Sequence, residues 1–238
     1  MKAVSLLIIL GGLLVQGTPY TGTVRIISHH ASKDFVPDGD LDKAVWKNAS
    51  RARLGNNADP GKPEPDAATE VAAAWTESSL YFAFWNTFTV LNTYEGEDPK
   101  IERWQLWDRD VVEVFINPFP ERLNLYWEFE VAPNNQWVDL EINLDRRAAG
   151  KMSNAGWNSG FLHATRVDPA SRRWYCEMRI PTGPMGVSRI RAGSEWRINF
   201  YRADGPGSDD RRRFLSWSPT LDGSFHKPER FGLIRFEK

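Results

Sequence analysis

Short runs in which every second residue is apolar constrain the fold of this 238-residue chain more than any other feature. In residues 174–180, the apolar side chains are Trp174, Cys176, Met178 and Ile180. Successive side chains of a β-strand point to opposite faces, so this run predicts a strand with one face towards a core. The same alternation recurs in residues 110–117 and 196–201. The intervening side chains are expected to face outwards, among them Tyr175, Glu177, Arg179, Arg197, Asn199 and Tyr201.

Two further β-prone runs, residues 71–75 and 80–85, are joined by the turn-like residues 76–79. Strands at this spacing, separated by turn residues, are typical of a sandwich or a barrel. We therefore expect an all-β chain that forms a single two-sheet antiparallel β-sandwich, of the immunoglobulin-like or jelly-roll type.

Four polar segments are predicted to be loops, namely residues 55–68, 86–108, 146–160 and 203–213. The second is long for a connection inside a compact domain, and loops of that length are often functional. The chain contains no convincing domain boundary, so residues 18–238 are expected to form one domain.

The first seventeen residues have the pattern of a secretory signal peptide. Lys2 supplies a positive start, residues 3–15 form an apolar run, and Gly17 ends a small-residue cleavage site. A membrane-spanning helix needs ~20 residues, which is more than this run provides. We expect residues 1–17 to be removed and the mature protein to be periplasmic or extracellular, with no membrane attachment. Cys176 is the single cysteine, and its neighbours predict a buried thiol.

Charge and tryptophan content narrow the choice of ligand. The formal net charge is −1, which gives no electrostatic basis for binding nucleic acid or an anionic membrane. Eleven tryptophans are many for a chain of this length. Some must belong to the core, but the surplus favours a surface on which a ligand stacks.

Four segments, taken together and in order, resemble the family 9 carbohydrate-binding modules. They are residues 38–42 (Asp-Gly-Asp-Leu-Asp) followed by Trp46; residues 69–81; residues 107–117 (Trp-Asp-Arg-Asp-Val-Val-Glu-Val-Phe-Ile-Asn); and residues 216–218 leading to 225–232. The resemblance spans roughly residues 36–236. It implies a non-catalytic β-sandwich that clamps a terminal sugar of an oligo- or polysaccharide between two aromatic rings, in the service of carbohydrate catabolism and alongside glycoside hydrolases.

The family's ligand residues match this sequence only in part. The first ring of the clamp matches Trp107, and the second falls on Phe225, where the best-known members have Trp. An acidic partner six residues after the first ring matches Glu113. The remaining polar positions depart from the family: Asp222 replaces an amide, Tyr201 replaces Gln, and an Arg position falls near Glu130. The preference for one sugar end therefore does not carry over.

The chemistry of a pyranose suits the matching residues. An aromatic ring buries the C–H face of a sugar, while carboxylates accept hydrogen bonds from its hydroxyls. Trp107 could instead be a core residue, but its neighbours are polar. Glu113 could be a solvated carboxylate or the ion-pair partner of an Arg, so both interpretations stay open.

A catalytic alternative depends on paired carboxylates. Glu128 and Glu130 share one strand face, and Asp139 and Glu141 share another. Glycosidases use two carboxylates ~5–10 Å apart. Carboxylates at alternate positions are common on solvated strands, so the sequence favours binding over hydrolysis.

Haem and calcium are the cofactors to consider. The same sandwich resembles exported cytochrome domains, for which Met152, Met178, Met185 and His163 provide candidate ligands. The carbohydrate-binding resemblance requires no cofactor, although family members hold structural calcium. For calcium, the candidates are Asp38, Asp40 and Asp42, but the full EF-hand spacing is missing, so a turn with side-chain hydrogen bonds is the simpler interpretation. An accessory role, in contact with another exported protein, also remains open.

Overall fold

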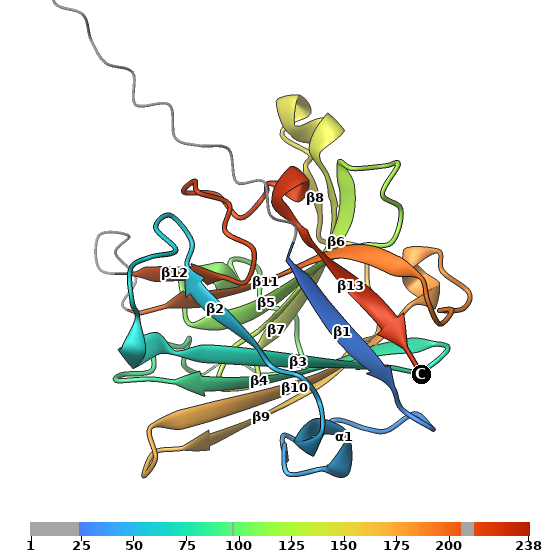
Figure 1. Cartoon of the computed structure of the whole chain (residues 1–238). Coiled ribbons are helices and arrows are strands. Elements are labelled where there is room, and N and C mark those ends of the chain that lie inside the picture. Colours follow the sequence, from blue (N-terminus) through green and yellow to red (C-terminus); the bar gives the residue numbers. More distant parts are fainter. Residues whose placement is uncertain (1–23, 97, 206–211) are drawn as a thin grey trace, which may run out of the picture.

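The computed structural model describes residues 24–96, 98–205 and 212–238 (Figure 1). The strands are β1 (Arg25–His30), β2 (Ala52–Asn56), β3 (Thr69–Trp75), β4 (Ser79–Thr87), β5 (Val111–Asn117), β6 (Leu125–Val131), β7 (Trp137–Asn143), β8 (Ser153–Asn154), β9 (Leu162–Asp168), β10 (Arg173–Pro181), β11 (Glu195–Asp204), β12 (Arg213–Ser216) and β13 (Gly232–Glu237). The helical segments are short: α1 (Ala44–Lys47), η1 (Pro65–Ala67), η2 (Leu106–Asp108), η3 (Leu144–Ala149), η4 (Gly183–Met185) and η6 (Pro228–Arg230).

Hydrogen-bonded neighbours run in the order β8-β7-β6-β5-β11-β12-β2-β3-β4-β10-β9. The chain thus forms two packed layers, one around β5, β6, β7 and β11 and the other around β3, β4, β10 and β9 (Figure 1). β12 pairs with both β11 and β2, and so joins the layers at one edge. The predicted antiparallel sandwich is confirmed, with one exception: β1 lies parallel to both β13 and β3.

The core lies between the layers, where the alternating runs predicted it. Trp174, Cys176, Met178 and Ile180 are all fully buried in it. Across the core, Phe82 of β4 meets Phe200 of β11 with ring centroids 5.4 Å apart. The expectation of a buried Cys176 is therefore confirmed.

The prediction that the opposite strand faces are solvated is wrong in part. Glu177, Asn199 and Tyr201 are fully buried, although they point away from the central core. Each layer carries a second apolar cluster on its outer face, and chain segments outside the strands cover it. Alternation shows that a strand has two faces, but it does not show whether something covers the outer one.

We call the outer surface of β3, β4 and β10 the capped face, because residues 35–49 with α1 pack over it (Figure 1). The carboxylate of Glu177 lies under this cap. It accepts hydrogen bonds from the backbone N–H groups of Asp38 (2.9 Å) and Gly39 (3.3 Å), from Lys43 Nζ (2.5 Å) and from Trp46 Nε1 (2.8 Å). The Asp-Gly-Asp-Leu-Asp segment therefore anchors the chain to β10.

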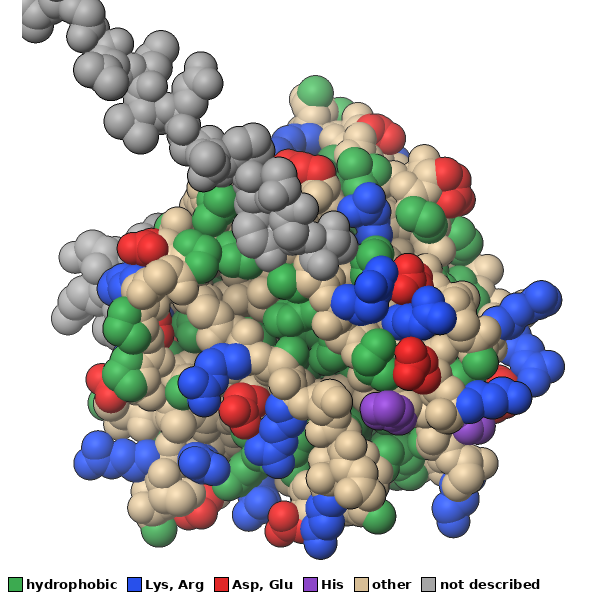
Figure 2. Space-filling model, in the orientation of Figure 1, with side chains coloured by type: hydrophobic (Ala, Val, Ile, Leu, Met, Phe, Trp, Pro, Cys, Tyr) green, Lys and Arg blue, Asp and Glu red, His purple; other side chains and the backbone are tan. Residues whose placement is uncertain are grey.

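We call the outer surface of β5, β6, β7 and β11 the pocket face. Its apolar cluster includes Phe115, Tyr126 and Tyr201, and it is covered by the long loop after β4 and by the segment between β12 and β13. These two coverings leave a hollow between them, which is described below. On the side of the molecule shown in Figure 2, basic and acidic side chains are interspersed, in keeping with the net charge of −1.

The predicted signal peptide, residues 1–17, lies outside the described residues, as does most of the predicted loop 203–213. Within the part of the chain that the structure describes, no helix combines the length and apolar character needed to cross a membrane.

Candidate functional site

The pocket face holds a pocket of about 550 Å³, a size typical of small-molecule sites. Its walls combine aromatic rings, the three carboxylate residues Asp108, Glu113 and Glu128, and small residues from β5, β6, β7, β8, β11 and β12 and from the covering segments. The residues that carry the argument are Trp104, Trp107, Glu113, Glu128, Arg212, Phe214, Phe225 and His226. The structure thus brings together Trp107, Glu113 and Phe225, three of the five residues predicted from sequence.

Trp107 forms one aromatic wall. It lies on η2 and is half-buried, whereas its neighbour Leu106 is fully buried in the apolar cluster below. The edge of Trp104 packs against it, with ring centroids 4.9 Å apart and planes at 81°. Trp104 itself is 44% exposed and was not predicted from sequence. Leu106 therefore anchors η2, which leaves Trp107 and Trp104 to line the pocket.

Phe225 forms a second aromatic wall, supported from below by Tyr201. The two rings stack with centroids 4.1 Å apart and planes at 16°. The Tyr201 hydroxyl donates to the Phe225 carbonyl oxygen (2.9 Å) and accepts from Asn199 Nδ2 (2.7 Å). Tyr201 is fully buried and does not line the pocket. The structure therefore places Tyr201 beneath the Phe225 ring and not on the pocket wall, where the resemblance had led us to expect it.

Asp222 also differs from its expected place. Its side chain is exposed and pairs with Lys227 Nζ at 2.9 Å, and the residue does not line the main pocket. Its backbone carbonyl accepts from Asn57 Nδ2 (2.8 Å), which fixes the start of the 222–226 segment. The Lys227 ammonium holds the pKa of the Asp222 carboxyl below its usual value. Asp222 therefore lies outside the main pocket and helps to shape the loop that carries Phe225.

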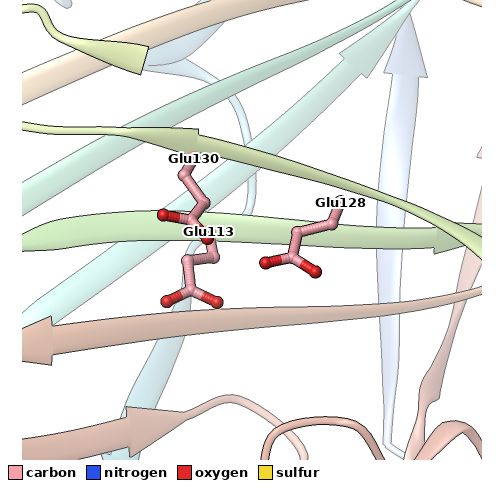
Figure 3. Close-up of side chains that lie close together, drawn as sticks. All are labelled: Glu113, Glu128 and Glu130. Atoms are coloured by element: carbon pink, nitrogen blue, oxygen red, sulfur yellow. The ribbon is translucent and has the colours of Figure 1, made fainter. Parts of the chain in front are cut away.

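Three carboxylates converge at one side of the pocket, and we call Glu113, Glu128 and Glu130 the glutamate cluster. Each offers an oxygen within 4.8 Å of the others, and all three side chains are buried (Figure 3). The register of the sheet produces this convergence, because Glu113 of β5 lies directly opposite Glu130 of β6, and Glu128 follows on the same face. Glu113 and Glu128 line the pocket, whereas Glu130 lies behind them.

The cluster has few partners of its own. Among the described residues, no donor reaches either carboxylate oxygen of Glu130 or Oε2 of Glu128. Burial, followed by the charge of Glu128, raises the pKa of Glu113 well above its usual value. Burial, followed by the charges of Glu113 and Glu128, does the same to Glu130. Unit charges ~4 Å apart repel by about 4 kcal/mol at an effective dielectric constant of 20, so full ionisation of the empty cluster is costly.

Two basic side chains stand near the cluster. The positive charge of Arg212 offsets part of the rise in the pKa of Glu113. The Arg212 guanidinium donates hydrogen bonds to the backbone carbonyls of Trp107 and Arg109. His226 also lines the pocket, and its Nδ1 lies 2.7 Å from the Tyr126 hydroxyl. Burial lowers the pKa of His226. Neither group reaches the unpartnered oxygens of Glu128 and Glu130.

The aspartates considered for calcium make side-chain hydrogen bonds within a turn. Asp38 Oδ1 accepts from the Asp40 N–H (2.9 Å) and pairs with Lys43 Nζ (2.6 Å), while Asp40 Oδ1 accepts from the Asp42 N–H (2.9 Å). These are the side-chain turn bonds of the simpler interpretation. Over the described residues, the one convergence of three or more metal-ligand side chains is the glutamate cluster. A structural calcium elsewhere stays a prediction.

The candidate haem ligands do not face one another across a slot. Met178 and His163 are directly opposed on β10 and β9, so both point to the same side of one sheet. His163 packs against Phe161 with centroids 5.0 Å apart, and burial lowers its pKa to about 4. Met185 is buried in the core, whereas Met152 lines the pocket. An axial pair needs ligands on opposite sides of a flat ring, which Met178 and His163 do not provide.

Together, the strand order and the aromatic pocket define a β-sandwich with a ligand-sized hollow on one outer face. The chain belongs to the carbohydrate family 9 binding domain-like family, whose model matches residues 37–238. A curated relative is an "Extracellular protein" of Arthroderma benhamiae. It is 24% identical over 170 residues, which are 64% of this chain and 75% of the relative.

Solved structures show the same fold. A protein from Bacteroides uniformis superposes with a TM-score of 0.70 at 17% identity, over 91% of this chain and 100% of that one. A family 9 carbohydrate-binding module from Caldicellulosiruptor kristjanssonii, in complex with cellotriose, gives 0.65 at 19% identity, over 90% and 94% of the two chains. Its complex with glucose gives 0.64 at 19%, over 90% and 96%.

Proposed function

We propose that this chain is an exported carbohydrate-binding module that holds a sugar unit in the pocket and does not hydrolyse it. The observation that carries the proposal is the pocket itself, which places Trp107 and Phe225 on the walls and the carboxylates of Glu113 and Glu128 beside them. The rings would bury the C–H faces of a pyranose, and the carboxylates would accept hydrogen bonds from its hydroxyls.

Family membership and the relatives support the ligand class. The chain's family is defined by carbohydrate binding, and a structural neighbour is a module bound to cellotriose or glucose. Export is supported by the signal-like residues 1–17 and by a relative named as extracellular. In this setting, the module would serve carbohydrate catabolism by holding an oligo- or polysaccharide.

The test is calorimetric titration of cello-, xylo- and chito-oligosaccharides into wild type, Trp107→Ala and Phe225→Ala. A ring that stacks on sugar contributes roughly 1–3 kcal/mol, so each variant should bind about 5- to 150-fold more weakly while its melting temperature changes little. A core ring would instead cost roughly 3–5 kcal/mol of stability. A large drop in melting temperature, or unchanged affinity in both variants, would refute the aromatic clamp.

The capped face offers a matched control for Phe225. Phe35 is also half-buried and stacks on a fully buried tyrosine, Tyr81, with centroids 4.1 Å apart and planes at 18°. Phe35→Ala therefore removes an equivalent stack far from the pocket and should leave sugar affinity unchanged. Product analysis after long incubation with the same oligosaccharides tests for hydrolysis, and cleavage that disappears in Glu128→Gln would replace binding with catalysis.

A further inference from the structure

The glutamate cluster is more acidic than recognition of neutral hydroxyls requires. One carboxylate accepts from two or more hydroxyls, because an ionised carboxylate has about four lone-pair sites. Two carboxylates of the cluster line the pocket, as Asp108 does, and all three cluster members offer oxygens within 4.8 Å of one another. Such a group of buried acids is costly unless something positive completes it.

Within the cluster, one unpartnered side chain indicates what kind of ligand group could bind there. Glu130 is fully buried and points into the cluster from β6, yet no donor among the described residues reaches either of its oxygens. Oε2 of Glu128, which faces the same space, also lacks a donor. The guanidinium of Arg212, which lines the pocket, donates to the carbonyls of Trp107 and Arg109. The cluster therefore has unused acceptor oxygens, and a positively charged ligand would favour the ionised form of its carboxyls.

We propose that the pocket selects amino sugars, and that a protonated primary amine on the pyranose binds at the glutamate cluster. A primary ammonium has three N–H donors and one carbon substituent. The two carboxylates of the cluster that line the pocket suit two of these donors, while the carbon side of the amine leads back to the sugar ring between Trp107 and Phe225. Glu113 and Glu128 accept directly, and Glu130 adds charge from behind. The inference rests on the proposed sugar-binding function of the same pocket.

A divalent cation is the competing occupant, and the donor set favours the amine. Calcium takes six to eight oxygen ligands, including backbone carbonyls and water. The cluster offers three side chains, of which Glu130 does not line the pocket, and the Arg212 guanidinium stands close to Glu113. The aromatic walls beside the carboxylates also suit a ligand with an apolar face, which a bare ion does not have.

The experiment uses three trimers with the same β-1,4 backbone. Their sugars carry a hydroxyl (cellotriose), an amine (glucosamine trimer) or an acetamide (N-acetylglucosamine trimer) at the second carbon. With the mature protein, the amine trimer should bind at least about tenfold more tightly than cellotriose, because charge-assisted hydrogen bonds are the stronger ones. The acetamide trimer should gain nothing over cellotriose, since its nitrogen is neutral.

Variants locate the effect at the cluster. Glu128→Gln should weaken binding of the amine trimer at least about tenfold more than it weakens binding of cellotriose, because only the amine trimer brings a positive charge to this carboxylate. Glu130→Gln should also weaken binding of the amine trimer. Glu141→Gln is the matched control, because this substitution removes the same charge from the same layer. Glu141 lies on β7 and does not line the pocket. It should leave all three affinities unchanged, and thermal melts confirm that each variant folds.

Several outcomes would overturn the inference. Cellotriose binding as tightly as the amine trimer would refute it while the proposed sugar-binding function stands, whereas failure of every oligosaccharide to bind would refute both. An equal loss in Glu141→Gln would show that the attraction is not local. Calcium chloride at millimolar concentration that raises the melting temperature of wild type but not of Glu128→Gln would assign the cluster to a metal. A trilysine peptide that binds as tightly as the amine trimer would show that the sugar is not recognised.

Discussion

The two outer faces of the sandwich are built alike but differ in how they treat buried charge. On the capped face, Phe35 stacks on buried Tyr81, and on the pocket face Phe225 stacks on buried Tyr201, with centroids 4.1 Å apart in both pairs. Each face also buries carboxylates. Glu177 on the capped face receives hydrogen bonds from two backbone N–H groups, a lysine and a tryptophan, all supplied by residues 38–46.

The glutamate cluster on the pocket face has no equivalent set of donors. Its members repel one another, and Glu130 has no donor among the described residues. The difference separates two uses of a buried acid. Where the chain supplies the donors, the carboxylate stabilises the fold; where it does not, the acceptors are available to a ligand. The same substitution, Glu to Gln, should therefore have opposite effects on stability at the two faces.

The largest effect is expected at the capped face. Glu177→Gln removes the negative charge that four donors share and places an amide N–H₂ among them. Loss of one partner of a buried charged network costs about 3–5 kcal/mol, and because Lys43 is partly exposed we expect about 3 kcal/mol. Urea unfolding at neutral pH measures it. Glu70→Gln on the outside of β3, whose partners Arg51 and Arg53 are exposed, is the control and should change stability by less than about 1 kcal/mol. A loss of that small size in Glu177→Gln would show that the cap does not depend on this carboxylate.

At the pocket face, the same change should stabilise the protein. Glu130→Gln removes one of three like charges and supplies N–H groups that can donate to Glu113 and Glu128. We expect a gain of about 1.5–3 kcal/mol at about pH 8, the size of one hydrogen bond to a charged group. Urea unfolding measures this gain as well. Destabilisation by a similar amount would mean that Glu130 is already satisfied, and the contrast between the faces would fail.

The sequence predicts the strands better than it predicts what covers them. Alternation placed Trp174, Cys176, Met178 and Ile180 in the core because a strand's period is a local property. The same pattern predicted wrongly that Glu177 is exposed to solvent. The residues that cover it lie more than 130 positions away in the chain, so local alternation could not indicate them. Burial on an outer face depends on non-local packing, which no local period records.

The pocket shows the same limit. Family resemblance located Trp107, Glu113 and Phe225, and alternation placed Glu128 and Glu130 on one face. Glu113 lies beside Glu128 and Glu130 because β5 pairs with β6 in one particular register. The local sequence does not determine that register. Trp104 lies in a loop without a repeating pattern, so no signal distinguished it from other exposed tryptophans.

The smallest effect is a difference in pH dependence, and it tests the same contrast without a ligand. The folded-state pKa values of Glu113 and Glu130 are raised above the usual 4.5, so the folded protein binds more protons than the unfolded chain between that value and the raised ones. The stability associated with these protonated carboxyls is fully present below about pH 4.5 and is lost as the pH rises through the folded-state values.

Wild type should therefore lose stability relative to Glu130→Gln as the pH rises above about 4.5, because one of these groups cannot titrate in the variant. The advantage of the variant should be smallest well below pH 4.5, where Glu130 is protonated in both states of the wild type, and should grow as the pH rises towards the folded-state pKa. Parallel urea titrations of the two proteins at several pH values measure the difference. A difference that stays constant with pH would show that Glu130 ionises in the folded state as it does in the unfolded chain. The proposed contrast between the glutamate cluster and the carboxylate of Glu177 on the capped face would then fail.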